Sequence, residues 1–134
     1  MEKVTVSWLD ETKTAILCTY NQEGWTWEDF FVALQTQKAM IETVDRPKVH
    51  IIVDVRKSTW LPKGGSILSG MKKMSNERHP RQGQTIIVGS RGMVASIAGT
   101  VAKLMASSRI EMHFASKMEE VPALLSQFET ARPL

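Results

Sequence analysis

Basic residues and glycines are concentrated in the middle third of the chain, where they could bind an anion. Residues 56–91 contain eight lysines and arginines and a single acid, whereas residues 1–46 contain eight acids and four bases. Glycines let a ligand approach the backbone amides, which donate hydrogen bonds to phosphate and carboxylate groups. The pattern predicts a surface for phosphate-bearing ligands, acidic proteins or anionic membrane. Solvated lysines that only keep the protein soluble are the alternative.

The residue types that most often perform catalysis form no catalytic pattern. His50, His79 and His113 are far apart in sequence and fit no metal-ligand spacing. Cys18 is the only cysteine, which excludes an intramolecular disulfide, and no evident base accompanies it. Asp54 could act as a base or a metal ligand, but it has no evident partner, and we expect it to organise the following loop. We therefore expect no enzyme activity, no metal and no cofactor.

Apolar segments predict the strands that position these residues. Residues 4–8 and 14–20 flank a turn and predict an antiparallel hairpin. The segment 49–55 is almost continuously apolar and β-branched, as expected of a central strand that is covered on both faces. Residues 85–88 predict the next buried strand, and residues 110–114 predict the last one.

Two helices are expected in the first two thirds of the chain. The first begins at Thr26, which is a good N-cap residue, and should end before Pro47. The second is a short helix over residues 64–74. Residues 75–83 are polar and basic and contain a proline and a glycine, so they predict a surface loop.

Two further helices complete the chain. One is expected over residues 94–104, and the last follows a capping box formed by Ser116 and Glu119. The order is β-β-α-β-α-β-α-β-α, which predicts right-handed crossovers and a mostly parallel sheet with an N-terminal hairpin strand. We expect a single α/β domain spanning residues 1–134.

This pattern resembles a STAS domain, the fold of sulfate transporters and anti-sigma-factor antagonists that is also called SpoIIAA-like. The resemblance rests on the hairpin, the strand ending at Asp54, Trp60 in the loop after it, the Gly64-Gly65 entry to a short helix and the three closing elements. The segment 24–28, Gly-Trp-Thr-Trp-Glu, is also similar to a group of small bacterial STAS-like proteins.

The resemblance implies that a partner kinase docks on the loop and helix after the central strand. In the family, a serine at the N-terminus of that helix is phosphorylated as a switch. Here the switch position falls at Lys63 or Gly64, neither of which can be phosphorylated as that serine is. Ser66 is displaced from it, and Ser58 and Thr59 lie upstream. The resemblance thus implies binding through this surface, and the sequence does not reassign the switch.

Ligands of open α/β sheets bind beyond the carboxyl ends of the parallel strands. Those ends lead into helix N-termini here, and Arg56 and Lys117 are also expected there. Turn-forming glycines and solvated arginines are the alternative, as are core packing of Trp60 and a first-turn role for Ser66. We call the predicted binding residues the basic rim: Lys57, Trp60, Lys63, Gly64, Gly65, Ser66, Ser90 and Arg91.

Together these features predict a bacterial, cytoplasmic, non-enzymatic regulatory or protein-binding module. It would recognise a protein partner or an anionic ligand through the basic rim and the helix that follows. The alternatives are a carrier or sensor of a small apolar, lipid or anionic ligand, whose cavity the eight methionines would line, and a small enzyme of unknown class.

The composition also bears on two other kinds of partner, nucleic acids and membranes. Nucleic-acid binding is not expected, because the basic loop lacks the interleaved aromatic residues of a stacking platform. No apolar segment is long enough to cross a membrane, although Trp60 among its neighbouring lysines could contact a membrane surface. The sequence leaves the oligomeric state open.

Overall fold

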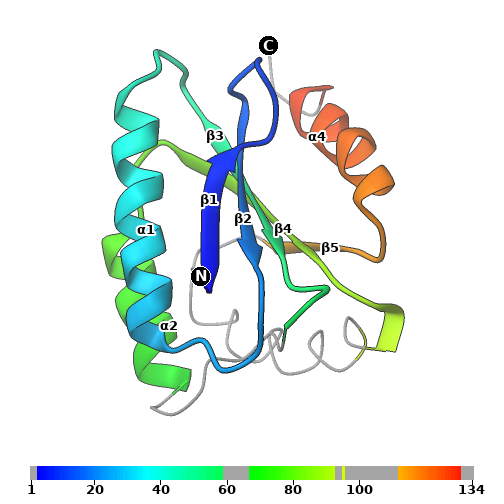
Figure 1. Cartoon of the computed structure of the whole chain (residues 1–134). Coiled ribbons are helices and arrows are strands. Elements are labelled where there is room, and N and C mark those ends of the chain that lie inside the picture. Colours follow the sequence, from blue (N-terminus) through cyan, green and yellow to red (C-terminus); the bar gives the residue numbers. More distant parts are fainter. Residues whose placement is uncertain (1–2, 59–66, 93–94, 96–111, 131–134) are drawn as a thin grey trace.

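Five strands form one sheet, and their order across the sheet is their order along the chain (Figure 1). The computed structural model describes residues 3–58, 67–92, 95 and 112–130. β1 (Val4–Trp8) pairs antiparallel with β2 (Ala15–Tyr20). The pairs that β2 makes with β3, β3 with β4, and β4 with β5 are all parallel, which confirms the predicted mostly parallel sheet with its hairpin strand. The bounds are Val49–Asp54 for β3, Gln82–Val88 for β4 and Met112–Ala115 for β5.

β3 is the central strand, as its apolar sequence predicts. It lies between β2 and β4, and five of its six residues are buried. Ile51 and its neighbours on the same side belong to one hydrophobic cluster, and Ile52 belongs to the cluster on the other side. Side chains alternate between the two faces of a strand, so this double burial requires cover on both faces.

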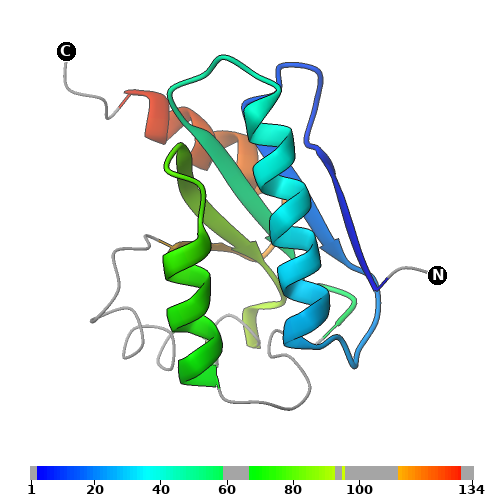
Figure 2. The ribbon, with the colours of Figure 1, turned by 90° about the vertical axis from the view of Figure 1, so that its left-hand side faces the viewer.

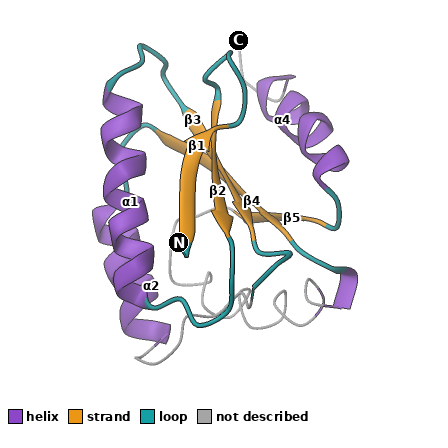
Figure 3. Ribbon diagram, in the orientation of Figure 1, coloured by secondary structure: helices purple, strands orange, loops and turns teal. Residues whose placement is uncertain are grey.

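Helices supply that cover. α1 (Trp27–Glu42) and α2 (Ile67–Glu77) lie side by side on one face, and α4 (Val121–Thr130) covers the other (Figures 1 and 2). The crossovers from β2 to β3 and from β3 to β4 step across the sheet in the same direction. Right-handed crossovers of this kind place both helices on the same face. Figure 3 shows how the helices flank the strands.

The start of α1 agrees with the sequence. The Thr26 hydroxyl accepts a hydrogen bond from the Asp29 amide at 3.2 Å, and the Asp29 carboxylate accepts one from the Thr26 amide at 2.8 Å. This reciprocal pair is a capping box, which stabilises the first turn. Trp25 is buried beside it and packs on Tyr20 with ring centroids 4.6 Å apart. The helix ends at Glu42, before Pro47 as expected.

The expected loop over residues 75–83 is wrong at both of its ends. α2 continues to Glu77, and β4 already begins at Gln82, where it pairs with Val49 of β3. Backbone pairing does not require apolar side chains, so Gln82 and Gly83 extend the strand despite their composition. Gly83 is needed there, because a Cβ atom at this position would lie 2.5 Å from Nδ1 of His50.

The predicted capping box of Ser116 and Glu119 is also wrong. The Ser116 amide and hydroxyl donate to the carboxylate of Glu120 instead, at 3.2 and 2.9 Å. The chain enters α4 through a 3₁₀ turn, η1 (Met118–Glu120), and this displaces the contact by one residue. Most of the helix expected over residues 94–104, and the first two residues of the strand expected over residues 110–114, lie outside the described residues.

The packing of α1 on α2 leads to a prediction at Gly70. A Cβ atom there would lie 2.2 Å from Cε2 of Trp27, whose ring is stacked on Phe31 and meets Phe30 edge-on. Gly70→Ala gains about 1 kcal/mol of helix propensity but overpacks this contact, so we expect a net loss of about 1–2 kcal/mol in the free energy of unfolding. Urea denaturation measures this change.

Gly92→Ala is the matched control, since a Cβ atom at Gly92 meets nothing within 4 Å. We expect its midpoint to equal or slightly exceed that of the wild type. An unchanged midpoint for Gly70→Ala would show that the contact with Trp27 costs no more than the helix propensity gained, about 1 kcal/mol.

Candidate functional site

Three of the eight basic-rim residues can be placed. Lys57, Ser90 and Arg91 are all exposed. The other five, Trp60, Lys63, Gly64, Gly65 and Ser66, lie outside the described residues.

The placed rim residues follow strands that end at one edge of the sheet. The Val55 amide donates to the Val88 carbonyl at 3.0 Å, and the Gly89 amide donates to the Ala115 carbonyl at 3.0 Å. β3, β4 and β5 therefore stop level with one another. Lys57 follows the first of these strands, and Ser90 and Arg91 follow the second. This is the edge at which ligands bind open α/β sheets.

Arg56, which was expected to serve ligand binding at this edge, is instead bound to Asp54. Its Nε and Nη2 atoms donate to the two carboxylate oxygens at 2.9 and 2.8 Å, and its backbone amide donates at 3.1 Å. The Asp54 side chain is 10% exposed, against 47% for Arg56. Asp54 thus organises the loop after β3, as expected, and its partner is the residue two positions later.

This ion pair sets the charge state of Asp54. Burial opposes ionisation, but the hydrogen bonds from the side chain and the amide of Arg56 outweigh it and lower the pKa of the carboxyl from its ordinary value. The guanidinium and the carboxylate largely cancel each other's charge at this edge. Lys57 and Arg91 are therefore the exposed rim cations that the structure describes.

The bases of residues 56–91 do not share one surface. Arg78 and Arg81 precede β4 and so lie at the opposite edge of the sheet, while Lys72 and Lys73 are exposed on α2. A strand and a returning helix carry the chain across the sheet, so bases that are neighbours in sequence are separated in space. The basic residues at the rim are therefore fewer than the eight that the composition of residues 56–91 suggested.

Acidic residues also reach the edge where the rim lies. The hydrogen bonds that Arg56 donates to Asp54 are the main cause that raises the pKa of Arg56. The charge of Glu119 raises it further, which places this carboxylate near the rim. Glu28 and Asp29 stand in the first turn of α1, whose N-terminus lies at the same edge. The edge is thus positive near the ends of β3 and β4 and negative near α1.

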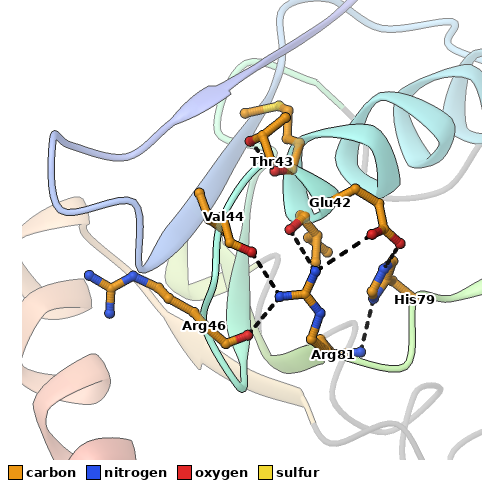
Figure 4. A network of polar contacts seen from close by, with 8 residues as sticks. Glu42, Thr43, Val44, Arg46, His79 and Arg81 are labelled. Carbon is orange, nitrogen blue, oxygen red and sulfur yellow. Dashed lines mark hydrogen bonds and ion pairs between the residues drawn. The ribbon is translucent and has the colours of Figure 1, made fainter.

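Arg81 connects the start of β4 to the end of α1 and the loop after it, at the edge of the sheet where β3 and β4 begin (Figure 4). Its Nη1 donates to the carbonyl oxygens of Val44 and Arg46, both at 2.9 Å, and its Nη2 donates to that of Ile41 at 3.0 Å. The last carbonyls of a helix have no partner within the helix, and here a guanidinium supplies one. Sequence reasoning gave no role to Arg81, because its acceptors lie 35 to 40 residues away in the chain.

His79 belongs to the same network and has both ring nitrogens engaged. Its Nδ1 accepts a hydrogen bond from the Arg81 amide at 3.0 Å, so Nε2 carries the hydrogen and donates to Glu42 at 2.6 Å. This bond is the main reason that the pKa of Glu42 is lowered. Because both nitrogens are hydrogen-bonded and the ring is buried, His79 has no free nitrogen for proton transfer to a ligand. It acts as a structural link.

The other two histidines meet under α4 although 63 residues separate them in the sequence. Nδ1 of His50 accepts from the Gln84 amide at 2.9 Å, and Nε2 of His113 bonds Oε1 of Gln84 at 3.0 Å. Both rings pack on Phe128, with centroids 5.3 and 4.7 Å away. No group of three or more potential metal ligands occurs among the described residues.

Cys18 is buried beneath α1. It accepts a hydrogen bond from Nε2 of Gln37 at 2.9 Å, and both residues are less than 5% exposed. Burial raises the pKa of the Cys18 thiol to about 12, despite the opposing effect of Gln37. A thiol that stays protonated and covered is no nucleophile, which supports the expectation of a structural residue.

Comparison with protein-family models finds no match, and the comparisons with curated proteins and with solved structures also find none. Among the described helices, none has both the length and the apolar character needed to cross a bilayer.

The ion pair of Asp54 and Arg56 predicts an acid-dependent loss of stability. The folded state holds Asp54 ionised at a lower pH than the unfolded state does, so the pair stabilises the fold above the ordinary carboxyl pKa. That contribution is lost as the pH falls through the lowered pKa. At pH 7, Asp54→Asn should cost about 1–2 kcal/mol of unfolding free energy, because the exposed guanidinium is partly screened.

Denaturation of both proteins between pH 7 and pH 3 checks this, and the difference between them should shrink as the solution becomes more acidic. Asp45→Asn, at an exposed position, is the control and should have no effect. A difference that stays constant with pH would show that the carboxylate charge does not contribute.

The burial of Cys18 predicts that its thiol is unreactive. Ellman's reagent at pH 8 should label the folded wild type only at the rate of global unfolding, and it should label the denatured chain fully. Ser7→Cys provides the comparison, since position 7 is exposed on β1 and should add one rapidly labelled thiol. Rapid labelling of the folded wild type would mean that α1 opens locally.

Proposed function

We propose that this protein is a non-enzymatic, STAS-like regulatory module that binds an acidic partner protein at the edge where β3 and β4 end. The binding surface is the basic rim together with α2. The protein works in the cytoplasm of a bacterium. It needs no cofactor.

The observation that carries the proposal is the exposure of Lys57 and Arg91 at the ends of adjacent parallel strands. Asp54, the last residue of β3, is neutralised by Arg56. Lys72 and Lys73 add two exposed cations on α2, whose N-terminus faces the same edge. Lys57 and Arg91 thus place positive charge on two neighbouring segments at this edge, and the two lysines lie on the helix that begins there. Such charge attracts and orients an acidic partner.

The engagement of the reactive groups supports a role without catalysis. Three described groups that could act as a base or nucleophile have a structural task. Asp54 holds Arg56, His79 links Glu42 to the Arg81 amide, and Cys18 is buried against Gln37. A catalytic pair needs a nucleophile and a base that face a substrate.

The positions of the methionines give the carrier alternative little support. Met40 and Met112 pack against one hydrophobic cluster, and Met118 packs against the other. Three hollows lined by described residues have no methionine among those residues. These methionines fill the core, where flexible side chains suit irregular gaps.

The STAS-like assignment rests on the element order and on the parallel sheet that begins with a hairpin. In that family the loop and helix after the central strand contact a partner. The corresponding part of this chain contains Lys57 and α2. The surface that the family uses for a partner therefore coincides with the surface that carries the exposed cations of this chain.

The test is a titration with a short peptide of alternating glutamate and glycine, followed by NMR of the backbone amides. We expect the largest shifts at Lys57, Ser90 and Arg91. The double variant Lys57→Glu/Arg91→Glu should bind at least about tenfold more weakly, since two attractive charges become repulsive. Wild-type affinity should fall as salt rises from about 50 to about 500 mM.

The matched control is Lys13→Glu/Lys48→Glu, which makes the same change of net charge at exposed positions on the opposite edge. It should retain most of the affinity. Equal binding by the two double variants would exclude the rim as the binding surface. A parallel titration with inorganic phosphate should give weaker binding, and tighter binding of phosphate would indicate a small-anion site instead.

A further inference from the structure

β1 forms an outer edge of the sheet and lacks the features that usually protect such an edge. Its sequence, Val-Thr-Val-Ser-Trp, contains no charge and no proline, and β2 lies on only one side of it. Natural edge strands are commonly blocked by lysine, proline or a bulge, because their free backbone groups can pair with another strand. The register between β1 and β2 is continuous from Val4 to Trp8, so no bulge interrupts it.

The hydrogen-bond pattern shows which backbone groups are directed outward. Asn21 donates to the Lys3 carbonyl at 2.8 Å, and Leu9 donates to that of Ala15 at 2.9 Å. Hydrogen bonding alternates along an antiparallel pair, so the odd-numbered residues of β1 bond to β2. The amides and carbonyls of Val4, Val6 and Trp8 therefore point away from β2, toward the outer edge.

A hollow runs beside this edge, between β1 and α1. Its volume is about 550 Å³, and its walls include Val4, Val6, Val32 and Ala33. Val32 is 63% exposed, and among the described residues it is the large hydrophobic residue that is exposed to solvent. The hollow and Val32 place an apolar stripe of α1 directly above the outward-facing groups of β1.

The charges that flank β1 favour pairing with itself. Lys3 comes immediately before the strand, and Asp10 and Glu11 follow shortly after it. An antiparallel copy reverses the order, so the cation at one end of each strand comes next to the acids at the far end of the other. The uncharged strand is thus self-complementary, as a two-fold symmetric interface requires.

We propose that β1 pairs with β1 of a second copy, forming a two-fold symmetric dimer in which one sheet continues across both chains. Only even-numbered residues offer outward groups, so the pairing joins even to even positions. The register with greatest overlap centres on Val6 and sets Val4 opposite Trp8 of the partner. It forms hydrogen bonds at the three positions Val4, Val6 and Trp8 on each chain.

This pairing also determines where the two α1 helices lie. The two-fold axis is perpendicular to the sheet, so both α1 helices lie on the same face of the continuous sheet, and each contacts its own β1. The hollow beside β1, which Val32 lines together with the charged residues Lys3 and Asp29, then adjoins the same hollow of the other copy. Ala33 and Thr36 are small enough to permit this approach. The outer edge formed by β1 is a side of the sheet, whereas the basic rim lies where β3 and β4 end. The proposed dimer is therefore independent of the proposed function.

Sedimentation velocity of the full chain over a dilution series tests the assembly. We expect twice the mass of one chain at high concentration. Val32→Glu should weaken the dimer at least about tenfold, because it adds a second carboxylate beside Asp29 to the hollow at the junction on each copy. Gln35→Glu makes the same charge change one turn away, at an exposed position that lines a different hollow, and should leave the dimer intact.

Cysteine pairing tests the register. Thr5 of one copy faces Ser7 of the other as a non-hydrogen-bonded pair, with Cα atoms about 4.5 Å apart, which suits a disulfide. A mixture of the Thr5→Cys and Ser7→Cys variants should therefore form the mixed disulfide much faster than either variant forms its own. Both positions are exposed, and the buried Cys18 does not interfere.

Several outcomes overturn the proposal. A wild type that stays monomeric throughout the dilution series has no such interface. A dimer that Val32→Glu leaves intact, or one without preferential mixed-disulfide formation, uses another surface. Circular dichroism of each variant separates loss of assembly from loss of folding, and the cysteine result does not depend on Val32.

Discussion

Covering both faces of β3 is the requirement on which the rest of the structure depends. Its residues belong alternately to the cluster under α1 and α2 and to the cluster under α4. Parallel neighbours on both sides demand crossovers, and each crossover returns the chain across the sheet in a helix. α1 and α2 therefore begin at the edge where β3 and β4 end. The fold thus brings exposed cations and helix N-termini to one edge, although the segments that carry them are far apart in the sequence.

The two edges of the sheet perform different tasks. At the edge where β3 and β4 begin, Arg81 binds three carbonyls at the end of α1, and His79 and Glu42 complete the network. Those polar groups are satisfied within the chain. At the opposite edge, among the described residues, Asp54 pairs with Arg56 and Lys3 pairs with Asp29, while Lys57 and Arg91 are exposed. The hydrogen bonds of Arg81 and His79 hold the first edge together, and the exposed charges of the second edge are the basis of the proposed binding surface.

Periodicity predicted the strands well, because burial of a face leaves a regular trace in the sequence. The start of β4 at Gln82 and Gly83 left no such trace, since backbone pairing and the nearby His50 ring determine it. The exposed rim residues were predicted from their position after apolar strands. The roles of Arg81 and Gln37 were not, because their partners are distant in sequence, and hydrogen bonds across the fold have no local signature. Arg56 was misjudged because its acceptor is a neighbouring carboxylate, which composition counts as a separate charge.

The two proposed surfaces have a fixed geometric relation. An antiparallel union of two β1 strands reverses one sheet relative to the other, so the carboxyl ends of β3 and β4 in the two copies point in opposite directions. The basic rims then lie at opposite ends of the dimer and face away from its axis. A compact acidic partner can contact one rim but cannot span both, so each dimer presents two independent binding surfaces. Self-association through β1 therefore leaves partner binding unobstructed and doubles its valency.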